Sequence, residues 1–501
     1  MKKMFKSSLL IAGALMLSLT ECKNLTESPD YSSPESFFAN DSDLKAGVNG
    51  AYRPLNYEWF NSYYNRCVID CALGIQTGYE KGPQYYKRGQ YVATDEYILA
   101  FWAQIYDGIN RVNVVLDAID TKGANFSADV AKQASGEMRF LRAMYMYQVF
   151  GVFENIPVPI RPTKELGVYE SNAGGKDKAI AQMIADLSVA ENELPNTATD
   201  GRPTKWAAKT LLAKVLLEKG DNAAAKAKAE EVVNTSGLTL FPDFASTVDV
   251  AHENQNERLF EIQGDFNTSP WQNYNNMHAH FTPTDWDGGD PNTLSVGDGI
   301  TAAGWGDAWI VGDINWRKDM FADANDKRIP VTFMSRYRSK NAGGDVVEWD
   351  PNAASPFIAP GSADRKFNNV IFQKVIEYNI GGWQYTQKNY VLLRLADAYL
   401  AHAEACANLN DAAGLTTLNA IRSRAGIAPV NSLTKDAVFE EWMREFAGDG
   451  WAFPLCRRFG KTAEIIQKYG GRQVDANKYR LMPIPQAEIL SNATITQNPG
   501  W

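Results

Sequence analysis

The sequence predicts a mainly α-helical protein, in which a scaffold of paired helices is interrupted by a long irregular insertion. In two blocks, residues 41–237 and 387–470, apolar residues recur at steps of three and four, as they do on buried helix faces. Between the blocks, residues 238–386 lose that period and become dense in Gly, Asp, Asn, Trp and Pro. Long irregular segments of this kind are usually functional loops carried by a rigid scaffold.

The first 22 residues have the pattern of an export signal. Three Lys among the first six residues precede an apolar run, Leu9–Leu19, that is too short to span a bilayer. The order Leu-Thr-Glu-Cys at residues 19–22 resembles a bacterial lipobox, in which the Cys is acylated and becomes the mature N-terminus. Glu21 departs from the small residue that usually precedes this Cys.

We therefore expect residues 1–21 to be a signal peptide and Cys22 to carry the lipid, with simple secretion as the alternative. Residues 22–40 are polar, contain two prolines and are expected to form a tether. Residues 41–501 then form a single domain, whose last part, 471–501, is expected to be extended and proline-rich.

The predicted helices end where Gly or Pro follows the apolar period, as at Gly151, Pro195, Gly220 and Gly426. Their lengths and short turns resemble tetratricopeptide units, although a regular period of about 34 residues is absent. In chain order they cover 101–116, 137–150, 179–194, 206–218, 222–234, 389–406, 415–425 and 434–446, the last with Thr434 as its N-cap.

Composition excludes several classes of function. The net charge of −9 makes the protein a poor partner for nucleic acid. Five cysteines form no disulfide framework, so buried free thiols are expected, with a Cys67–Cys71 bridge as the alternative. The four His fit no zinc motif, so a metal site has no support from the sequence. No nucleotide loop, nucleophile elbow or other cofactor motif is present, and no cofactor is expected.

Five segments of the chain, taken in order, carry a set of motifs: Trp102–Asn113, Glu137–Tyr147 leading to Gly151, Gly201–Lys214, Leu393–Ala405 with Leu418–Gly426, and Leu481–Ile489 with Gln497–Gly500. Together these segments resemble the SusD/RagB outer-membrane lipoproteins of Bacteroidetes. One departure is Pro454, which stands where the family usually has Asp.

This resemblance implies a SusD-like fold and a role in nutrient uptake and polysaccharide utilisation. Members of the family are carbohydrate-binding lipoproteins on the surface of the outer membrane. They capture glycans and pass them to a SusC-like, TonB-dependent transporter, which they cover as a lid. By this resemblance the chain is a binding protein and not an enzyme. Two alternatives stay open: the same scaffold binding a non-sugar nutrient such as peptides, and, more distantly, a hydrolase.

Clustered aromatic residues are the best candidates for ligand contact. The chain holds 13 Trp, 22 Tyr and 23 Phe. Flat rings stack on the C–H faces of sugars, and neighbouring polar groups orient the hydroxyls. For each ring, packing is the competing interpretation, and Trp102, Trp206, Trp309, Trp316 and Trp442 are assigned to packing. The candidate ligand residues are Tyr79, Tyr85, Tyr86, Trp271, Tyr274, Asp285, Trp286, Asp287 and Trp305.

Overall fold

The fold is that of a computed structural model. It describes residues 37–56, 62–78, 81–165, 167, 169–197, 201–264, 280–283, 310–339, 345–350, 352–353, 369–378 and 388–501. Cys22 and the predicted signal peptide lie outside these residues, so lipidation and processing stay predictions. Packing against the helical body begins at Phe38, which is 4% exposed.

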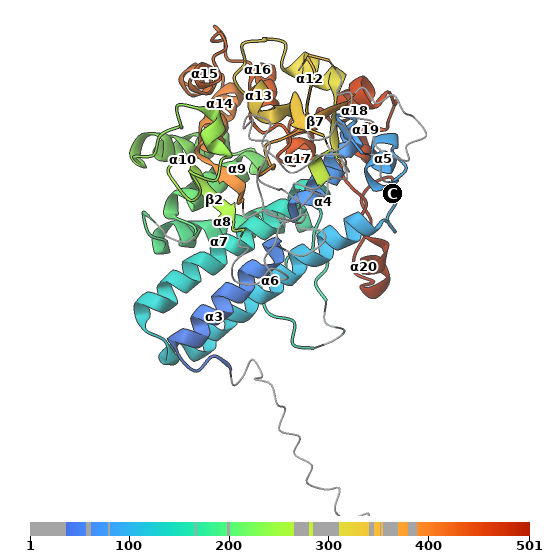
Figure 1. The fold of residues 1–501 in the computed structure, drawn as a ribbon. Helices are drawn as coiled ribbons and strands as arrows, with labels where there is room; N and C mark the ends of the chain where they lie inside the picture. The colour runs from blue at the N-terminus through green and yellow to red at the C-terminus, as the bar shows by residue number, and fades with distance from the viewer. Residues whose placement is uncertain are drawn as a thin grey trace, which may run out of the picture.

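Three helices form the lower part of the molecule in Figure 1: α3 (Asp41–Tyr52), α6 (Glu96–Lys122) and α7 (Ala128–Phe153). The side chain of Asn40 accepts hydrogen bonds from the first turn of α3 and starts that helix. Gly108 of α6 allows close approach to α7, because a Cβ there would lie 2.5 Å from the ring of Tyr145. The Tyr145 hydroxyl donates to the Ala51 carbonyl at 2.8 Å, which joins α7 to α3.

The scaffold continues as a row of helices in which each packs on the next. Helix α10 packs on α14 although residues 236–394 separate them in the chain. The insertion therefore leaves and re-enters the scaffold between two neighbouring helices, and the predicted architecture is confirmed. After α7 the row consists of α8 (Gly175–Glu193), α9 (Lys205–Lys219), α10 (Asn222–Thr235), α14 (Leu395–Leu409), α15 (Gly414–Arg424) and α16 (Lys435–Glu445).

Most strands come from the insertion, and the sheets are a minor part of the fold. The largest sheet is antiparallel and has the order β1-β3-β7-β4, and a separate hairpin pairs β5 with β6. The bounds are β1 (Gln76–Thr77), β3 (Val311–Asp313), β4 (Phe333–Met334), β5 (Arg336–Arg338), β6 (Val346–Glu348) and β7 (Asn369–Phe372), with α12 (Ile314–Met320) after β3 and α13 (Ile329–Thr332) before β4.

A third pairing corrects one sequence prediction. Strand β2 (Arg258–Ile262) pairs antiparallel with β8 (Tyr390–Arg394), so the helix predicted from residue 389 begins only at Leu395. The prediction failed because β8 is buried at four of its five positions. A short apolar run of this kind has the same pattern in a buried strand as in a buried helix.

Residues 471–501 carry two short helices, α19 (Ala476–Tyr479) and α20 (Gln486–Ser491), where the sequence predicted an extended chain. They follow α17 (Ala452–Arg458) and α18 (Thr462–Gly470), which lie within the predicted helical block 387–470. Helix α17 contains Pro454, the departure from the family pattern. Its start is capped from α4 (Ser62–Asp70), where Asp70 accepts hydrogen bonds from the backbone of Ala452 at 3.1 Å and Phe453 at 2.7 Å.

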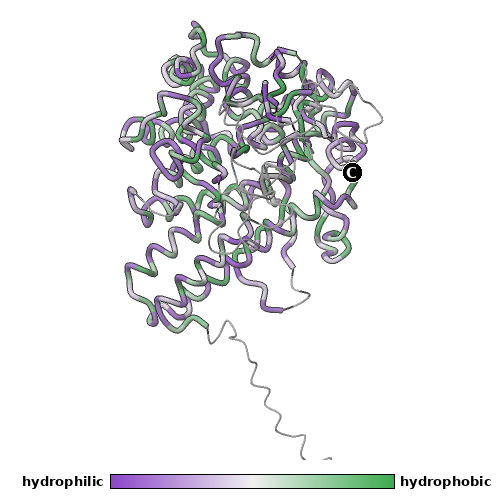
Figure 2. Tube along the Cα trace, viewed as in Figure 1, coloured by the Kyte–Doolittle hydropathy of each residue, from purple (hydrophilic) through white to green (hydrophobic). Residues whose placement is uncertain are grey.

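Four of the five tryptophans assigned to packing are buried as expected, and the fifth, Trp309, lies outside the described residues. Trp102, Trp206, Trp316 and Trp442 are all buried in the main hydrophobic core. The described cysteines are buried free thiols, as predicted, at positions 67, 71, 406 and 456. Hydrophobic and hydrophilic residues alternate along the helices in Figure 2. Among the described residues, no helix combines the length and the apolar character that crossing a bilayer requires.

A buried cluster of charges ties the scaffold to the insertion. Glu445 of α16 accepts hydrogen bonds from Arg394 at 2.7 Å, from Arg328 at 3.4 Å and from Arg424. Arg328, at the start of α13, also donates to Glu441 at 2.6 Å. Burial alone would raise the pKa of Glu445, but the three guanidiniums lower it far below the ordinary value. This cluster holds β8, α13, α15 and α16 in fixed positions.

Candidate functional site

Most of the predicted ligand residues lie outside the described residues. This holds for Tyr79, Trp271, Tyr274, Asp285, Trp286, Asp287 and Trp305. The structure does place Tyr85 and Tyr86, and it places the chain ends from which the other segments leave. The positions of these chain ends show from where the predicted ligand segments leave the described part of the structure.

Tyr85 and Tyr86 lie on α5 (Lys81–Arg88) and have opposite surroundings. Tyr85 is 40% exposed. Tyr86 is fully buried, stacks on Tyr91 with ring centroids 4.8 Å apart and donates to Asp95 at 3.0 Å. Successive side chains on a helix point about 100° apart, so one faces solvent and the next the core. Tyr86 therefore serves packing, and its assignment to the ligand platform is corrected.

Ends of three predicted ligand segments meet at one end of the four-stranded sheet. Thr77, at the end of β1, is paired with Val311, at the start of β3. The Ile310 amide donates to the His280 carbonyl at 3.0 Å. Chain connectivity therefore brings together the ends of three segments that lie outside the described residues: 79–80, 265–279 and 284–309.

The other end of β3 is fixed by Asp313, the last residue of the strand. Its carboxylate accepts from the amides of Asn315 at 2.9 Å and Trp316 at 3.2 Å, which starts α12. The same carboxylate pairs with Lys87 of α5 at 3.2 Å. The exposed ring of Tyr85 is thus carried by a helix that is tied to the end of β3.

A second junction joins the start of segment 265–279 to the end of segment 379–387. The Gly264 amide donates to Asn389 Oδ1 at 2.8 Å, and Asn389 Nδ2 donates to Glu261 at 2.8 Å. Glu253 accepts from the Asn389 amide at 2.7 Å. Burial raises the pKa of Glu253 to about 7 and raises that of Glu261 as well. Asn254 adds a reciprocal pair of amide hydrogen bonds with the neighbouring Gln263.

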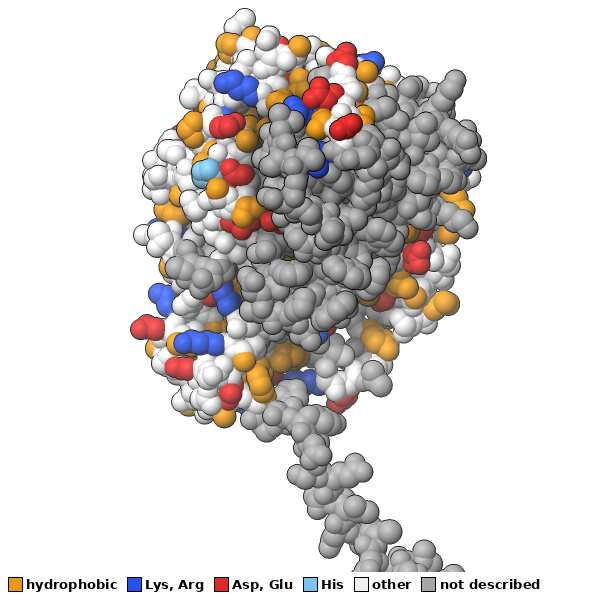
Figure 3. Space-filling view, viewed as in Figure 1, with side chains coloured by type: hydrophobic (Ala, Val, Ile, Leu, Met, Phe, Trp, Pro, Cys, Tyr) orange, Lys and Arg blue, Asp and Glu red, His pale blue; other side chains and the backbone are white. Residues whose placement is uncertain are grey.

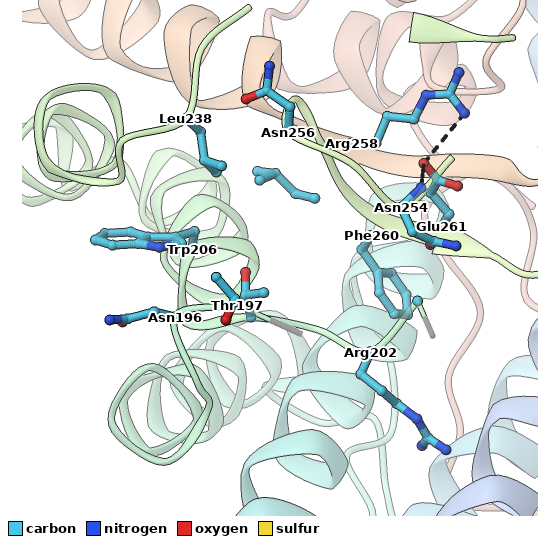
Figure 4. Close-up of a pocket in the computed structure, with 13 residues that line it drawn as sticks. Asn196, Thr197, Arg202, Trp206, Leu238, Asn254, Asn256, Arg258, Phe260 and Glu261 are labelled. Carbon is cyan, nitrogen blue, oxygen red and sulfur yellow. Dashed lines mark hydrogen bonds and ion pairs between the residues drawn. The ribbon is translucent and has the colours of Figure 1, made fainter. Parts of the chain in front are cut away.

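A cavity of about 140 Å³ lies beside this junction (Figure 4). The ring of Trp206 forms one side, and Phe260 and Asn254 face it from β2 and the preceding turn. Arg202 lies at the edge, where its guanidinium donates to Glu137 at 2.9 Å and covers the ring of Tyr52 at 4.7 Å. Ligand pockets usually measure about 300–1,000 Å³. This cavity is too small for an oligosaccharide and would hold only a small group.

A larger groove of about 560 Å³ runs between α6 and α20, and we call it the α6–α20 groove. Its floor includes Trp102 and Tyr106, whose rings lie 4.8 Å apart. Its walls come from the loop 157–170 and from the chain around α20. The lining residues are Trp102, Tyr106, Asp117, Pro157, Pro159, Arg161, Pro162, Thr163, Lys164, Glu165, Tyr169, Glu170, Glu488, Ser491, Asn492 and Ile495.

Apolar side chains and acidic groups surround this groove. Ile160, Tyr169 and Leu490 are 47%, 50% and 79% exposed, and they are among the most exposed large apolar residues described. Glu170 and Glu488 form no ion pair within the described part of the chain. On the face shown in Figure 3, by contrast, the charged side chains of the described residues are interspersed in sign.

A third cavity, of about 530 Å³, lies where α9, α14 and α17 meet. Its buried charges satisfy one another, since Arg458 forms a bidentate pair with Glu404 at 2.8 Å. Lys461 pairs with Asp436 at 2.8 Å and Glu464 at 3.3 Å. In the part of the chain that the structure covers, no group of three or more His, Cys, Asp or Glu side chains is arranged to hold a metal.

Two sequence families match the chain. One, described as "SusD family", matches residues 319–501, and the other, described as "Starch-binding associating with outer membrane", matches residues 23–217. The chain belongs to the SusD family. A SusD-like protein of Bacteroides ovatus is 26% identical over 488 residues, which cover 89% of this chain and 81% of that protein.

Solved structures of SusD homologues share the fold of this SusD-family protein. A SusD homologue from Bacteroides thetaiotaomicron superposes with a TM-score of 0.77 at 19% identity, covering 93% of this chain and 98% of the homologue. A laminarin-binding SusD-like protein superposes with a TM-score of 0.74 at 23% identity, covering 92% and 100%. At these identities the likeness establishes the fold.

The sequence did not point to the α6–α20 groove. Its residues come from α6, from the loop 157–170 and from the C-terminus, which are far apart in the chain. One local signal was available: Pro157, Pro159 and Pro162 lie close together and mark a stiff loop against an aromatic helix face.

Proposed function

We propose that this protein is a glycan-binding, non-catalytic lipoprotein of the outer membrane. The observation that carries the proposal is its membership of the SusD family, one branch of which is described as starch-binding and associated with the outer membrane. The laminarin-binding structural neighbour supports a polysaccharide as the ligand. Cys22 would carry the lipid that holds the protein on the membrane.

The ligand site we propose is the aromatic platform reached from the sheet edge at Thr77 and Val311. Tyr85 contributes from α5, and Tyr79, Trp271, Tyr274, Trp286 and Trp305 contribute from the segments that leave this edge and the second junction. Asp285 and Asp287 would orient sugar hydroxyls. Residues a few positions from a fixed chain end stay within a few multiples of 3.8 Å of it, which supports a shared location for Tyr79 and Trp286.

We propose that the glycan is delivered to a SusC-like TonB-dependent transporter. An extracellular loop of that barrel would dock in the α6–α20 groove. The exposed Ile160, Tyr169 and Leu490 favour a protein partner. The carboxylates of Glu170 and Glu488 favour a docking segment that carries Lys or Arg.

This docking surface is tested by co-purification of the barrel from native outer membranes through a tag on this chain. Ile160→Ser should reduce recovery of the barrel. Val250→Ser is the matched control, because Val250 is also 47% exposed and lies away from the groove. Equal recovery with both variants would place the docking surface elsewhere, and failure to recover any TonB-dependent barrel would remove this partner.

The glycan function is tested by calorimetry on the detergent-solubilised protein. The panel should include laminarin, xyloglucan and starch, with a peptide mixture as the rival ligand class. We expect saturable binding to at least one glycan and unchanged chain length after prolonged incubation. Binding to peptides alone would favour the other nutrient class, and cleavage products that vanish on a single Asp or Glu substitution would make the protein a hydrolase.

A further inference from the structure

One buried arginine has most of its guanidinium without a hydrogen-bond acceptor. Arg317 lies on α12, one turn after Asp313 at the end of β3, and is 1% exposed. Its Nη1 donates to Asn352 Oδ1 at 2.8 Å. Its Nε and Nη2 are also buried, and among the described residues they have no hydrogen-bond acceptor. Arg317 forms no ion pair with any described carboxylate, and its guanidinium lies 5.8 Å from the centroid of the Phe333 ring.

Five other buried arginines among the described residues have counter-ions, and Arg317 differs from these. The pairs are Arg142 with Asp186 at 2.6 Å, Arg328 with Glu441 at 2.6 Å, Arg394 with Glu445 at 2.7 Å, Arg424 with Glu257 at 2.7 Å and Arg457 with Glu218 at 2.6 Å.

An unpaired buried charge is expensive, because it loses hydration without gaining an ionic partner. Burial accordingly lowers the pKa of Arg317, and the charge of Asp350 opposes this only in part. The two unpaired nitrogens have a defined geometry. Nε and Nη2 lie on the same side of the planar guanidinium and form the fork that binds two oxygens of one carboxylate, sulfate or phosphate.

We propose that Arg317 recognises an acidic group on the glycan, in which two anionic oxygens take the vacant Nε and Nη2 positions. The group would be the carboxylate of a uronic acid or a sulfate ester. This inference rests on the proposed glycan function. Only β3 and the first turn of α12 lie between Val311, where the ligand segments leave the sheet, and Arg317. Because Arg317 is almost fully buried, its neighbours must move aside as the anion enters, and the anion then supplies the missing counter-ion.

The first test uses simple anions and thermal unfolding of the detergent-solubilised protein. Sodium glucuronate and sodium sulfate are compared with sodium chloride at equal ionic strength. The anion that matches the site should raise the Tm of the wild type, since a ligand that binds only the folded state stabilises it. Arg317→Met should abolish this rise. Lys318→Met, which removes an exposed charge from the same helix, should keep it.

The same variants separate a ligand-binding arginine from a structural one. Without any anion, Arg317→Met should melt at or above the wild-type temperature, because it removes an unpaired buried charge. A clear fall in Tm would show that the protein itself satisfies Arg317 and would overturn the proposal. If the Met variant does not fold, Arg317→Lys keeps the charge without the fork and should lose most of the anion response.

The second test measures affinity for two oligosaccharides of equal length, one bearing glucuronic acid and one neutral. Losing a two-pronged hydrogen bond to a charged group should weaken binding of the acidic sugar by about 10–100-fold in Arg317→Met. Binding of the neutral sugar should stay unchanged. If Arg317→Met binds both sugars as the wild type does, the inference fails while the glycan function stands. If the wild type binds no glycan of the wider panel, the proposed function itself fails.

Discussion

Replacing Glu445 by Gln removes the charge that three buried guanidiniums share. Arg394 and Arg424 are within hydrogen-bond distance of its Oε1, and Arg328 lies 3.4 Å from its Oε2. The substituted amide keeps one acceptor and turns an NH₂ group toward cations. Removing one member of a buried ion pair costs about 3–5 kcal/mol. We expect the upper part of that range, because three cations lose their common partner.

The assay is chemical unfolding followed by circular dichroism, with Glu440→Gln as the control. Glu440 lies on the same helix, its side chain is 51% exposed, and it pairs only with Arg444 at 3.4 Å among the described residues. Loss of such a surface pair should cost less than about 1 kcal/mol. A Glu445→Gln cost no larger than that of Glu440→Gln would refute the argument that this cluster holds the scaffold together.

The pH dependence of the same variant has a definite sign. Because the folded-state pKa of Glu445 is lowered, its contribution to stability is present above the ordinary value of 4.5 and is lost as the pH falls below it. The stability difference between wild type and Glu445→Gln should therefore shrink from pH 6 to pH 3. A difference that stays constant over this range would contradict the lowered pKa.

Four other substitutions test three separate features. Tyr86→Ala should destabilise the fold by about 3–5 kcal/mol, as for other buried aromatic residues. Tyr85→Ala should change the free energy of unfolding by less than about 0.5 kcal/mol, because its side chain is exposed. Similar effects of the two substitutions would contradict the opposite placement of these side chains on α5. Glu253→Gln should gain stability relative to the wild type as the pH rises from 4.5 to 7, since burial raises the folded-state pKa of this carboxyl to about 7. Metabolic labelling with palmitate should mark the wild type and not Cys22→Ser, and label on both would place the lipid elsewhere.

The helical scaffold could be predicted from the sequence because its signals are local. Apolar steps of three and four residues locate α6, α7, α8, α9 and α10 to within a few residues, except that α6 extends further at both ends and α7 begins earlier than predicted. Their ends follow from residues that act on their own backbone. Gly220 adopts a positive φ of 79° after α9, and Thr434 accepts a hydrogen bond from the Ala437 amide at the start of α16.

Features that depend on distant partners could not be predicted in this way. Tyr390–Arg394 forms a strand because β2 lies beside it, and nothing in its own pattern separates the two structures. Tyr86 is buried because Tyr91 and Asp95 fold back on it, although its neighbour Tyr85 has the same side chain. The cap of α17 comes from Asp70, which is remote in sequence from the helix it starts.

The sequence predicted which types of residue would form the candidate site, but not how they are arranged in space. Aromatic residues between Gly, Asp and Asn indicated a carbohydrate platform, and the pairing of Thr77 with Val311 brings the ends of their segments together. Arg317 escaped notice because an arginine in a sequence carries no sign of its partner. Only the structure distinguishes it from Arg328, whose guanidinium forms an ion pair with Glu441.

Glycan binding through an aromatic platform is tested most directly by replacing Trp286. Calorimetry with the glycan identified in the panel, together with the Tm, should be measured for the wild type and Trp286→Ala. We predict a loss of about 2 kcal/mol or more in binding free energy, as for central aromatic anchors, with the Tm nearly unchanged. Unchanged affinity, or a fall in Tm that accounts for the weaker binding, would contradict the claim and make Trp286 a packing residue.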